Sequence, residues 1–186
     1  MLFRSGGAVF ATDQTNASRT LLFDINTLAW NEQMCGLFSV PRAALAEVRD
    51  SNATFGETTV EGVLPTAIPI CGVMGDSQAA LFAEHCFQPG MAKVTFGTGS
   101  SVLLNIGDQP RTSGTAGVTA VAWRVRGQTT YAFEGLINLT GGTISWLRDQ
   151  LQLISDPRET EALAESVPDN GGVYLIPAFV GLSAPY

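Results

Sequence analysis

The sequence contains little of several residue types that define common classes of protein. Its 186 residues include one histidine, His85, and three cysteines, Cys35, Cys71 and Cys86, whose spacing is unlike that of zinc ligands. We therefore expect no metal site made of protein side chains, and three reduced thiols. Ten basic residues against 17 acidic ones give a net charge of −7, without any basic run. This balance argues against a nucleic-acid surface or a contact with anionic membranes.

Long apolar runs are also missing. Nowhere do eighteen apolar residues follow one another, and the amino terminus lacks the charged segment and apolar core of a secretory signal. We therefore expect a cytoplasmic protein, in which the triplets at Asn16, Asn52 and Asn138 carry no glycan. The length is that of one domain or of two small ones.

The most informative stretch is residues 68–82, IPICGVMGDSQAALF. The apolar run before Gly75 predicts a buried strand, and residues 77–86 have helical spacing. Asp76 then falls at a strand-to-helix junction, and ligands of open α/β sheets collect at the carboxyl ends of strands. The alternative is that Asp76 caps the helix by accepting hydrogen bonds from the amides that follow it.

A second stretch, residues 90–105, contains Gly97-Thr98-Gly99 between two apolar segments. This pattern predicts a β-hairpin whose glycines allow a positive φ or a close approach of another backbone. Backbone amides and the Thr98 hydroxyl could bind phosphate oxygens. A hairpin without a ligand explains the pattern equally well.

The remaining pattern predicts further elements and one loop. In residues 12–20, TDQTNASRT, we expect Asp13, Asn16, Ser18 and Arg19 to hold a turn by hydrogen bonds rather than to contact a substrate. Predicted helices span residues 30–40, 41–48, 136–153 and 159–166, and predicted strands span 118–125, 129–133 and 173–176. Expected core residues of the first two helices are Met34, Leu37, Phe38, Leu45 and Val48.

Two glycines near the first turns of the helix predicted at 136–153 need a reason, because each costs a helix about 1 kcal/mol. Gly141 and Gly142 could admit a nucleotide to the backbone. Close packing against a neighbouring element is the other explanation.

Several motifs together resemble one known family. Residues 75–82 (GDSQAALF), 90–93 (GMAK) and 95–99 (TFGTG) are similar to the FGGY family of carbohydrate kinases, and within it to the glycerol kinases. Three further parts, residues 12–20, 131–149 and 172–186, agree in the same order. The resemblance therefore covers nearly the whole chain.

The resemblance implies an α/β fold of the actin-like, ribonuclease-H-like type. Residues 1–88 would form the end of the amino-terminal substrate lobe, and residues 89–186 the start of the carboxy-terminal nucleotide lobe. Because the family's chains are more than twice as long, we expect a middle fragment. Without the family's phosphate-binding hairpin and adenine loop, it would be inactive alone.

The resemblance also implies the chemistry: ATP with Mg²⁺ phosphorylates a polyol or sugar hydroxyl, and Asp76 is the general base. Residues matching Gly97, Thr98, Gly141 and Ser145 contact the nucleotide. Asp76, Ser77 and Ser101 match substrate-binding positions, but glycerol kinases have glutamine and an aromatic residue where the two serines stand.

Two serines leave a roomier and more polar pocket, so glycerol is the first expected substrate and a pentulose the alternative. We also expect a homo-oligomer. Two hypotheses in which the chain is not catalytic remain: it is a folded fragment or interaction module, or it is a regulatory protein of the same fold.

Overall fold

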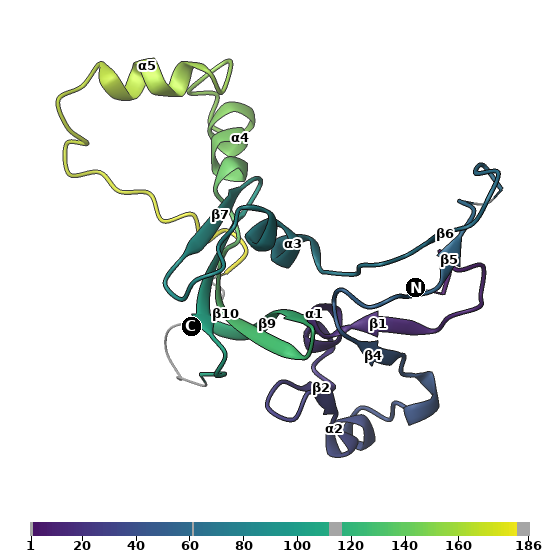
Figure 1. The fold of residues 1–186 in the computed structure, drawn as a ribbon. Helices are drawn as coiled ribbons and strands as arrows, with labels where there is room; N and C mark the ends of the chain where they lie inside the picture. Colours follow the sequence, from purple (N-terminus) through teal and green to yellow (C-terminus); the bar gives the residue numbers. More distant parts are fainter. Residues whose placement is uncertain (1, 61, 112–116, 182–186) are drawn as a thin grey trace.

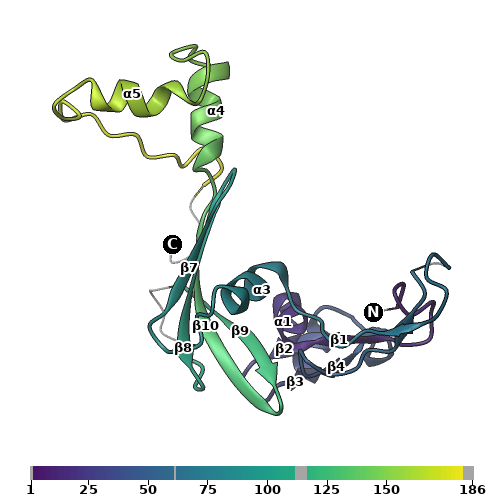
Figure 2. The same cartoon turned by 45° about the horizontal axis from the view of Figure 1, so that its top comes forward.

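The computed structural model describes residues 2–60, 62–111 and 117–181. Figure 1 shows a mixed α/β architecture, in which a twisted four-stranded sheet lies beside an amino-terminal part built of shorter strands. Among the helices of these parts are α1 (Gln14–Ala17), α3 (Asp76–Ala83), α4 (Gly141–Asp149) and α5 (Glu159–Glu165). Helices α4 and α5 extend beyond one end of the sheet (Figure 2).

The four-stranded sheet is antiparallel, with strand order β7-β8-β10-β9. Its strands are β7 (Ala92–Phe96), β8 (Ser100–Gly107), β9 (Val118–Val125) and β10 (Gln128–Ile137). Residues 97–99 turn β7 into β8, and Arg126 and Gly127 turn β9 into β10 with positive φ at both positions. Such a turn has the twist that adjacent antiparallel strands require. Both hairpins were predicted from the sequence.

Helix α3 covers one face of this sheet. Its Leu81 is fully buried and packs in a cluster with Leu103 of β8, Trp123 of β9 and Ala132 of β10. Since side chains of a strand alternate between faces, every second residue of β8 faces α3, including Ser101 as well as Leu103. The start of α3 and this face of the sheet therefore define one side of the molecule.

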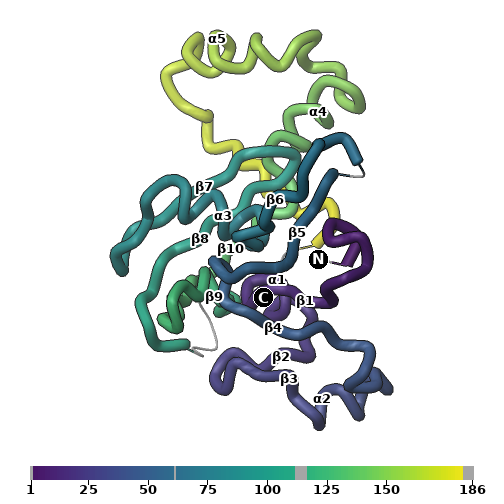
Figure 3. The backbone as a smooth tube through the Cα atoms, turned by 45° about the vertical axis from the view of Figure 1, so that its right-hand side comes forward, coloured from purple at the N-terminus to yellow at the C-terminus, as the bar shows by residue number. Residues whose placement is uncertain are grey.

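The amino-terminal part is built on a parallel pair, β1 (Ala11–Asp13) with β4 (Glu47–Arg49), and α1 follows β1 directly (Figure 3). Two antiparallel pairs complete it: β2 (Phe23–Asp24) with β3 (Ala29–Trp30), and β5 (Glu57–Thr58) with β6 (Ile68–Pro69). Helix α2 spans Glu32–Leu37, and short 3-10 helices span Ser18–Thr20 and Arg42–Ala44.

Residues 50–52 hold the β9–β10 hairpin near its turn, and we call this contact the clasp. The Gly127 amide donates to Asp50 Oδ2 at 2.6 Å, and the Ser51 amide donates to the Arg124 carbonyl oxygen at 2.7 Å. Arg124 Nε also lies 3.1 Å from Asp50 Oδ1. The clasp therefore joins the amino-terminal part to the sheet.

The helix predicted at 41–48 was wrong. Only Arg42–Ala44 is helical, as a 3-10 turn, and Val48 lies in β4. Pairing of β4 with β1 replaces the helical hydrogen bonds that the spacing suggested. The prediction that Leu37 and Phe38 belong to the core was also wrong: both side chains are exposed, and Cys35 is the buried residue of α2.

Other predicted elements also differ from the structure, according to whether a segment finds a strand partner. Residues 136 and 137 continue β10 through pairing with β8, so the helix begins only at Gly141. Residues 70–75, predicted as strand, form no regular element, and residues 173–176 are exposed and equally irregular. Within the described residues, neither segment lies in a sheet ladder, so its apolar sequence alone does not make a strand.

Candidate active site

Asp76 is the first residue of α3, and its side chain is exposed. Gly75 occupies the N-cap position, and no side chain caps the helix there. Asp76 Oδ1 accepts from the adjacent Ser77 amide at 2.7 Å, whereas a capping side chain would reach the second or third amide. The capping alternative is therefore not what the structure shows. A carboxylate in the first turn is favoured by the helix dipole and stays accessible to a ligand.

The backbone before Asp76 is fixed by the amino-terminal part. The Gly75 amide donates to Thr15 Oγ1 at 2.8 Å, and Thr15 Oγ1 donates to the Asp13 carboxylate at 2.8 Å. A Cβ at Gly75 would lie 2.6 Å from Gln78 Oε1, so a side chain there would require the Gln78 side chain to move. This chain of contacts sets the position of Asp76 from residues sixty positions earlier.

Asp13 is fully buried and is the centre of its loop. Besides Thr15, its carboxylate accepts from the Asn16 amide at 3.1 Å, from Asn16 Nδ2 at 2.7 Å and from Ser51 Oγ at 2.7 Å. The prediction that Asp13, Asn16 and Ser18 hold this loop is confirmed, since Ser18 Oγ also donates to the Thr15 carbonyl oxygen.

Arg19 behaves differently from its loop neighbours. Its guanidinium donates to Glu134 of β10, whose side chain is buried in the sheet. The ion pair joins the amino-terminal part to β10, so Arg19 holds its loop by a hydrogen bond that reaches beyond the loop. No local pattern predicts this pairing, because 115 positions separate the two residues.

The residues predicted to contact the nucleotide do come together. The Gly97 and Thr98 carbonyl oxygens accept from the Gly141 amide at 3.0 Å and the Gly142 amide at 2.9 Å, respectively. Ser145 lies one turn further along α4, and its hydroxyl donates to the Gly141 carbonyl oxygen at 3.4 Å. Gly97, Thr98, Gly141 and Ser145 are all exposed, so they form one accessible surface.

Packing explains why glycine stands at position 141. A Cβ there would lie 2.6 Å from the Gly97 carbonyl oxygen, which is backbone and cannot rotate away. Gly99 has a similar reason, since its Cβ would lie 2.7 Å from the carbonyl oxygens of Ile137 and Asn138. Close approach is thus confirmed for the hairpin, whereas neither Gly97 nor Gly99 has a positive φ. The packing explanation does not depend on a nucleotide.

Ser77 and Ser101 lie on different elements. Ser77 follows Asp76 in α3, and Ser101 lies on β8 beside a cavity of about 300 Å³ that Thr95, Leu136 and Asn138 also line. Among the described residues, no hydrogen bond joins Ser101 to Asp76 or Ser77. Ser101 Oγ instead accepts from Lys93 Nζ at 3.3 Å. Lys93 was missed from the sequence, although alternation along β7 places it on the same face as Thr95.

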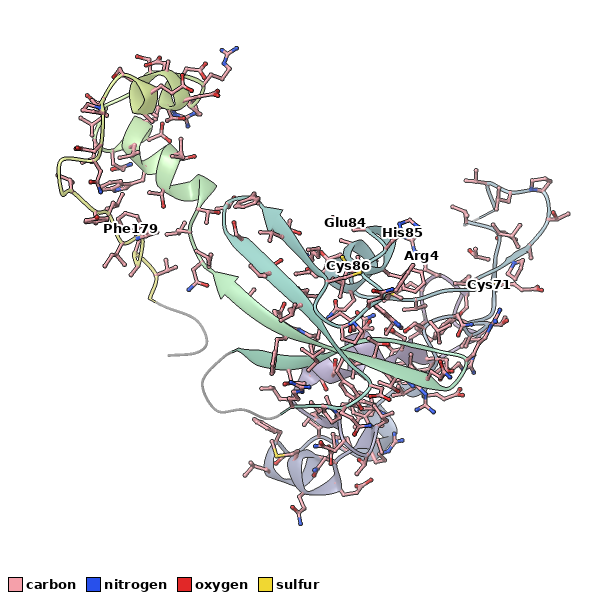
Figure 4. The ribbon with its side chains drawn as sticks, turned by 60° about the vertical axis from the view of Figure 1, so that its left-hand side comes forward. Arg4, Cys71, Glu84, His85, Cys86 and Phe179 are labelled. Atoms are coloured by element: carbon pink, nitrogen blue, oxygen red, sulfur yellow. The ribbon has the colours of Figure 1, made fainter. Side chains whose placement is uncertain are left out.

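Metal ligands, membrane-spanning helices and cysteines can also be assessed over the described residues. No group of three or more His, Cys, Asp and Glu side chains there could hold a metal ion, and none of the helices is long and apolar enough to cross a membrane. Cys35, Cys71 and Cys86 are free thiols. Figure 4 shows Cys71 well apart from Cys86 and His85 at the end of α3.

The class of protein follows from comparison of this fold and site with known families. The model of the amino-terminal domain of the FGGY family of carbohydrate kinases matches residues 1–83, and that of the carboxy-terminal domain matches residues 92–186. The chain therefore belongs to the FGGY family of carbohydrate kinases. The predicted lobe boundary after residue 88 remains a prediction.

Several relatives that closely match this chain are glycerol kinases. Glycerol kinase 1 of Thermotoga maritima is 52% identical over 180 residues, which are 97% of this chain and 36% of the relative. Glycerol kinase of Alcanivorax borkumensis is also 52% identical, with the same coverage. The chain thus spans little more than a third of the length of these relatives.

Solved structures give the same fold. Plasmodium falciparum glycerol kinase with ADP superposes with a TM-score of 0.87 at 38% identity, covering 99% of this chain and 37% of that one. A sugar kinase from Brucella ovis, described as a xyloylose kinase, has a TM-score of 0.81 at 18% identity, covering 100% and 38%. The second likeness concerns the fold alone. The predicted actin-like α/β fold is confirmed.

Proposed function

We propose that the protein containing this chain transfers the γ-phosphoryl group of ATP to a hydroxyl of a polyol or sugar, with glycerol as the first candidate. One observation carries the proposal: an exposed carboxylate, Asp76, begins α3 on a backbone fixed through Gly75, Thr15 and Asp13. A catalytic group must be held firmly to be effective. The glycerol kinases among the relatives support glycerol.

In this proposal Asp76 receives the proton of the attacking hydroxyl. The hydroxyl oxygen becomes a better nucleophile as its proton passes to the carboxylate. A base in this position contributes about 10²- to 10⁴-fold to the rate. Ser77 follows Asp76 in the same turn and would bind a neighbouring substrate hydroxyl.

Gly97, Thr98, Gly141 and Ser145 would hold the nucleotide. The residues fit such a ligand, because the two glycines leave an exposed backbone surface without side chains where the hairpin meets α4. When bound, ATP supplies the phosphoryl group, and Mg²⁺ that arrives with it neutralises phosphate charge. The α4 amides of Gly141 and Gly142 already donate to the hairpin, so their present role is to fix its position.

A pentulose is the second candidate substrate. Ser101 lines the cavity of about 300 Å³ beside the hairpin, and its hydroxyl suits an additional sugar oxygen. We further propose a cytoplasmic enzyme that forms a homo-oligomer. Exposed apolar side chains such as Phe96, Val173 and Ile176 support burial against other protein, either within a longer chain or in a second copy.

The test is ADP release by the full-length gene product with Mg²⁺ and ATP, offered glycerol, other polyols and ketopentoses. Asp76→Asn removes the proposed base, whereas Glu84→Gln makes the same chemical change on an exposed residue at the other end of α3. We expect turnover of glycerol, a loss of about 10²- to 10⁴-fold in kcat for Asp76→Asn, and little change for Glu84→Gln. ATP binding should persist in both variants.

Three results would each contradict a different part of the proposal: the base, the first candidate substrate or the reaction. Near-normal turnover by Asp76→Asn would remove Asp76 as the base. Turnover of a ketopentose alone would replace the substrate but keep the reaction. No turnover of any substrate, with ATP still bound, would favour a non-catalytic protein.

A further inference from the structure

Lys93 is the only lysine of the 186 residues, and it is buried in the sheet with 2% of its surface exposed. Its ammonium group donates to Thr95 Oγ1 at 2.7 Å and to Ser101 Oγ at 3.3 Å. No carboxylate forms an ion pair with it in the parts of the chain that the structure describes. Burying a charge with only hydroxyl partners is costly, so the arrangement calls for a reason.

The nearest acidic group on this row of the sheet has another partner. In the sheet register Lys93 lies opposite Leu103, and Leu103 lies opposite Glu134, so these three side chains are on the same face. Glu134 pairs with Arg19. The positive charge of Lys93 is therefore directed at Thr95 and Ser101 rather than balanced by a neighbouring acid.

The chemistry of an ammonium group fixes what these hydroxyls can do. An ammonium has donors only, so Thr95 Oγ1 and Ser101 Oγ must accept from Lys93. Each hydroxyl then keeps its own proton to donate in another direction. Hydrogen bonding to a cation also strengthens the hydroxyl as a donor.

Both hydroxyls border the same open space. Thr95 and Ser101 line the cavity of about 300 Å³ between β7, β8 and the end of β10, together with Gly99, Ser100 and residues 136–138. Lys93 itself does not line the cavity; it lies on the same face of the sheet as Thr95, two residues earlier on β7. A ligand in the cavity thus meets two hydroxyl groups that both accept a hydrogen bond from the neighbouring Lys93.

We propose that Lys93 is a positioning residue for substrate binding: it holds Thr95 and Ser101 as donors to a substrate oxygen that accepts hydrogen bonds. This inference rests on the proposed function and extends it to two residues outside the predicted site, Lys93 and Thr95. The substrate oxygen is one that is not phosphorylated, since Asp76 acts on the reacting hydroxyl.

The test compares variants of the full-length enzyme by the KM for glycerol, the KM for ATP and kcat. Lys93→Met keeps the length of the side chain without a donor, and Lys93→Gln keeps a neutral N–H donor. A double variant, Thr95→Val with Ser101→Ala, removes both hydroxyls, and a triple variant adds Lys93→Met to it. Thermal unfolding of each variant shows whether it is folded.

We expect Lys93→Met to raise the KM for glycerol by about tenfold, with kcat and the KM for ATP little changed. Lys93→Gln should recover part of this loss. The triple variant should match the double variant, because Lys93 acts only through the two hydroxyls.

Other outcomes separate the possible failures. A wild-type KM in folded Lys93→Met, or a triple variant clearly worse than the double one, would overturn the role of Lys93 while leaving the kinase assignment intact. Equal losses in Lys93→Met and Lys93→Gln would also contradict orientation by a donor. A wild-type enzyme without turnover would refute the proposed function, and with it this inference.

Discussion

Replacing Gly141 by alanine should loosen the contact between the 97–99 hairpin and α4. The new Cβ would lie 2.6 Å from the Gly97 carbonyl oxygen, closer than carbon and oxygen atoms approach in proteins. Since the α4 backbone fixes the position of the Cβ and the oxygen belongs to the backbone of the hairpin, the helix or the hairpin must move. Forced packing of this kind costs about 1–3 kcal/mol.

Gly36 provides a matched control for this substitution. It lies in the last turn of α2, and no heavy atom lies within 4 Å of the position that its Cβ would occupy. Gly36→Ala should therefore stabilise α2 by about 0.5–1 kcal/mol through helix propensity. The same chemical change is thus expected to have opposite signs at the two positions.

Hydrogen exchange followed by mass spectrometry measures the effect where it arises. The amides of Thr140, Gly141 and Gly142 donate to the carbonyl oxygens of Gly97 and Thr98. A local loss of about 1–3 kcal/mol should speed exchange of residues 139–143 about 5- to 150-fold in Gly141→Ala, but not in Gly36→Ala. The KM for ATP should rise in the first variant only. Unchanged exchange with a stability gain at both positions would refute the packing explanation.

Three further predictions concern stability, measured by urea unfolding. Asp13→Ala should lower the free energy of unfolding by about 2–4 kcal/mol, because Thr15, Asn16 and Ser51 lose a buried acceptor. Asp24→Ala, at an exposed turn, should lower it by less than about 0.5 kcal/mol. Equal losses in the two variants would contradict this prediction. Arg19→Met should lower the free energy of unfolding by about 1–3 kcal/mol, because Glu134 stays buried without its partner. Arg42→Met removes an exposed pair with Glu32 and should lower it by less than about 0.5 kcal/mol. Equal losses in the two variants would count against the Arg19–Glu134 pair. Burial raises the pKa of Tyr131 above its ordinary value of 10.0, so the folded state holds the proton more tightly; stability is full below pH 10 and falls as pH rises through the higher folded pKa. Tyr131→Phe should lose about 1 kcal/mol at pH 8 with the hydrogen bond to the Ile25 carbonyl oxygen, but lack this alkaline fall; an identical alkaline fall would assign it to another group.

Local patterns predicted the hairpins and helices whose hydrogen bonds are themselves local. The 97–99 turn, the β9–β10 hairpin and α3 all agree with the sequence prediction, apart from shifts of a few residues at their ends. The predictions that failed depended on distant partners. Residues 47 and 48 pair with β1, and residues 136 and 137 pair with β8, so tertiary hydrogen bonds overrode helical spacing.

The candidate site shows the same division. Asp76 and the glycines of the hairpin stand out in the sequence because they interrupt apolar runs. The support of Asp76 by Thr15 depends on a contact between segments far apart in the chain, and the hydrogen bond of the buried Lys93 to Ser101 depends on the pairing of two strands. No local pattern encodes them, although the alternation of β7 could have flagged a lysine on its buried face.

The clasp between residues 50–52 and the β9–β10 hairpin has a consequence for the order of folding. Antiparallel strands joined by a two-residue turn can pair within microseconds, since little chain must be closed. The clasp instead closes a loop of more than seventy residues, for example between Asp50 and Gly127. Loop closure of that length costs entropy before any contact repays it. We therefore expect the sheet to form first and the clasp to form late. Removing the hydrogen bonds of the Asp50 side chain by substitution should then accelerate unfolding, while the refolding rate of the protein stays nearly unchanged.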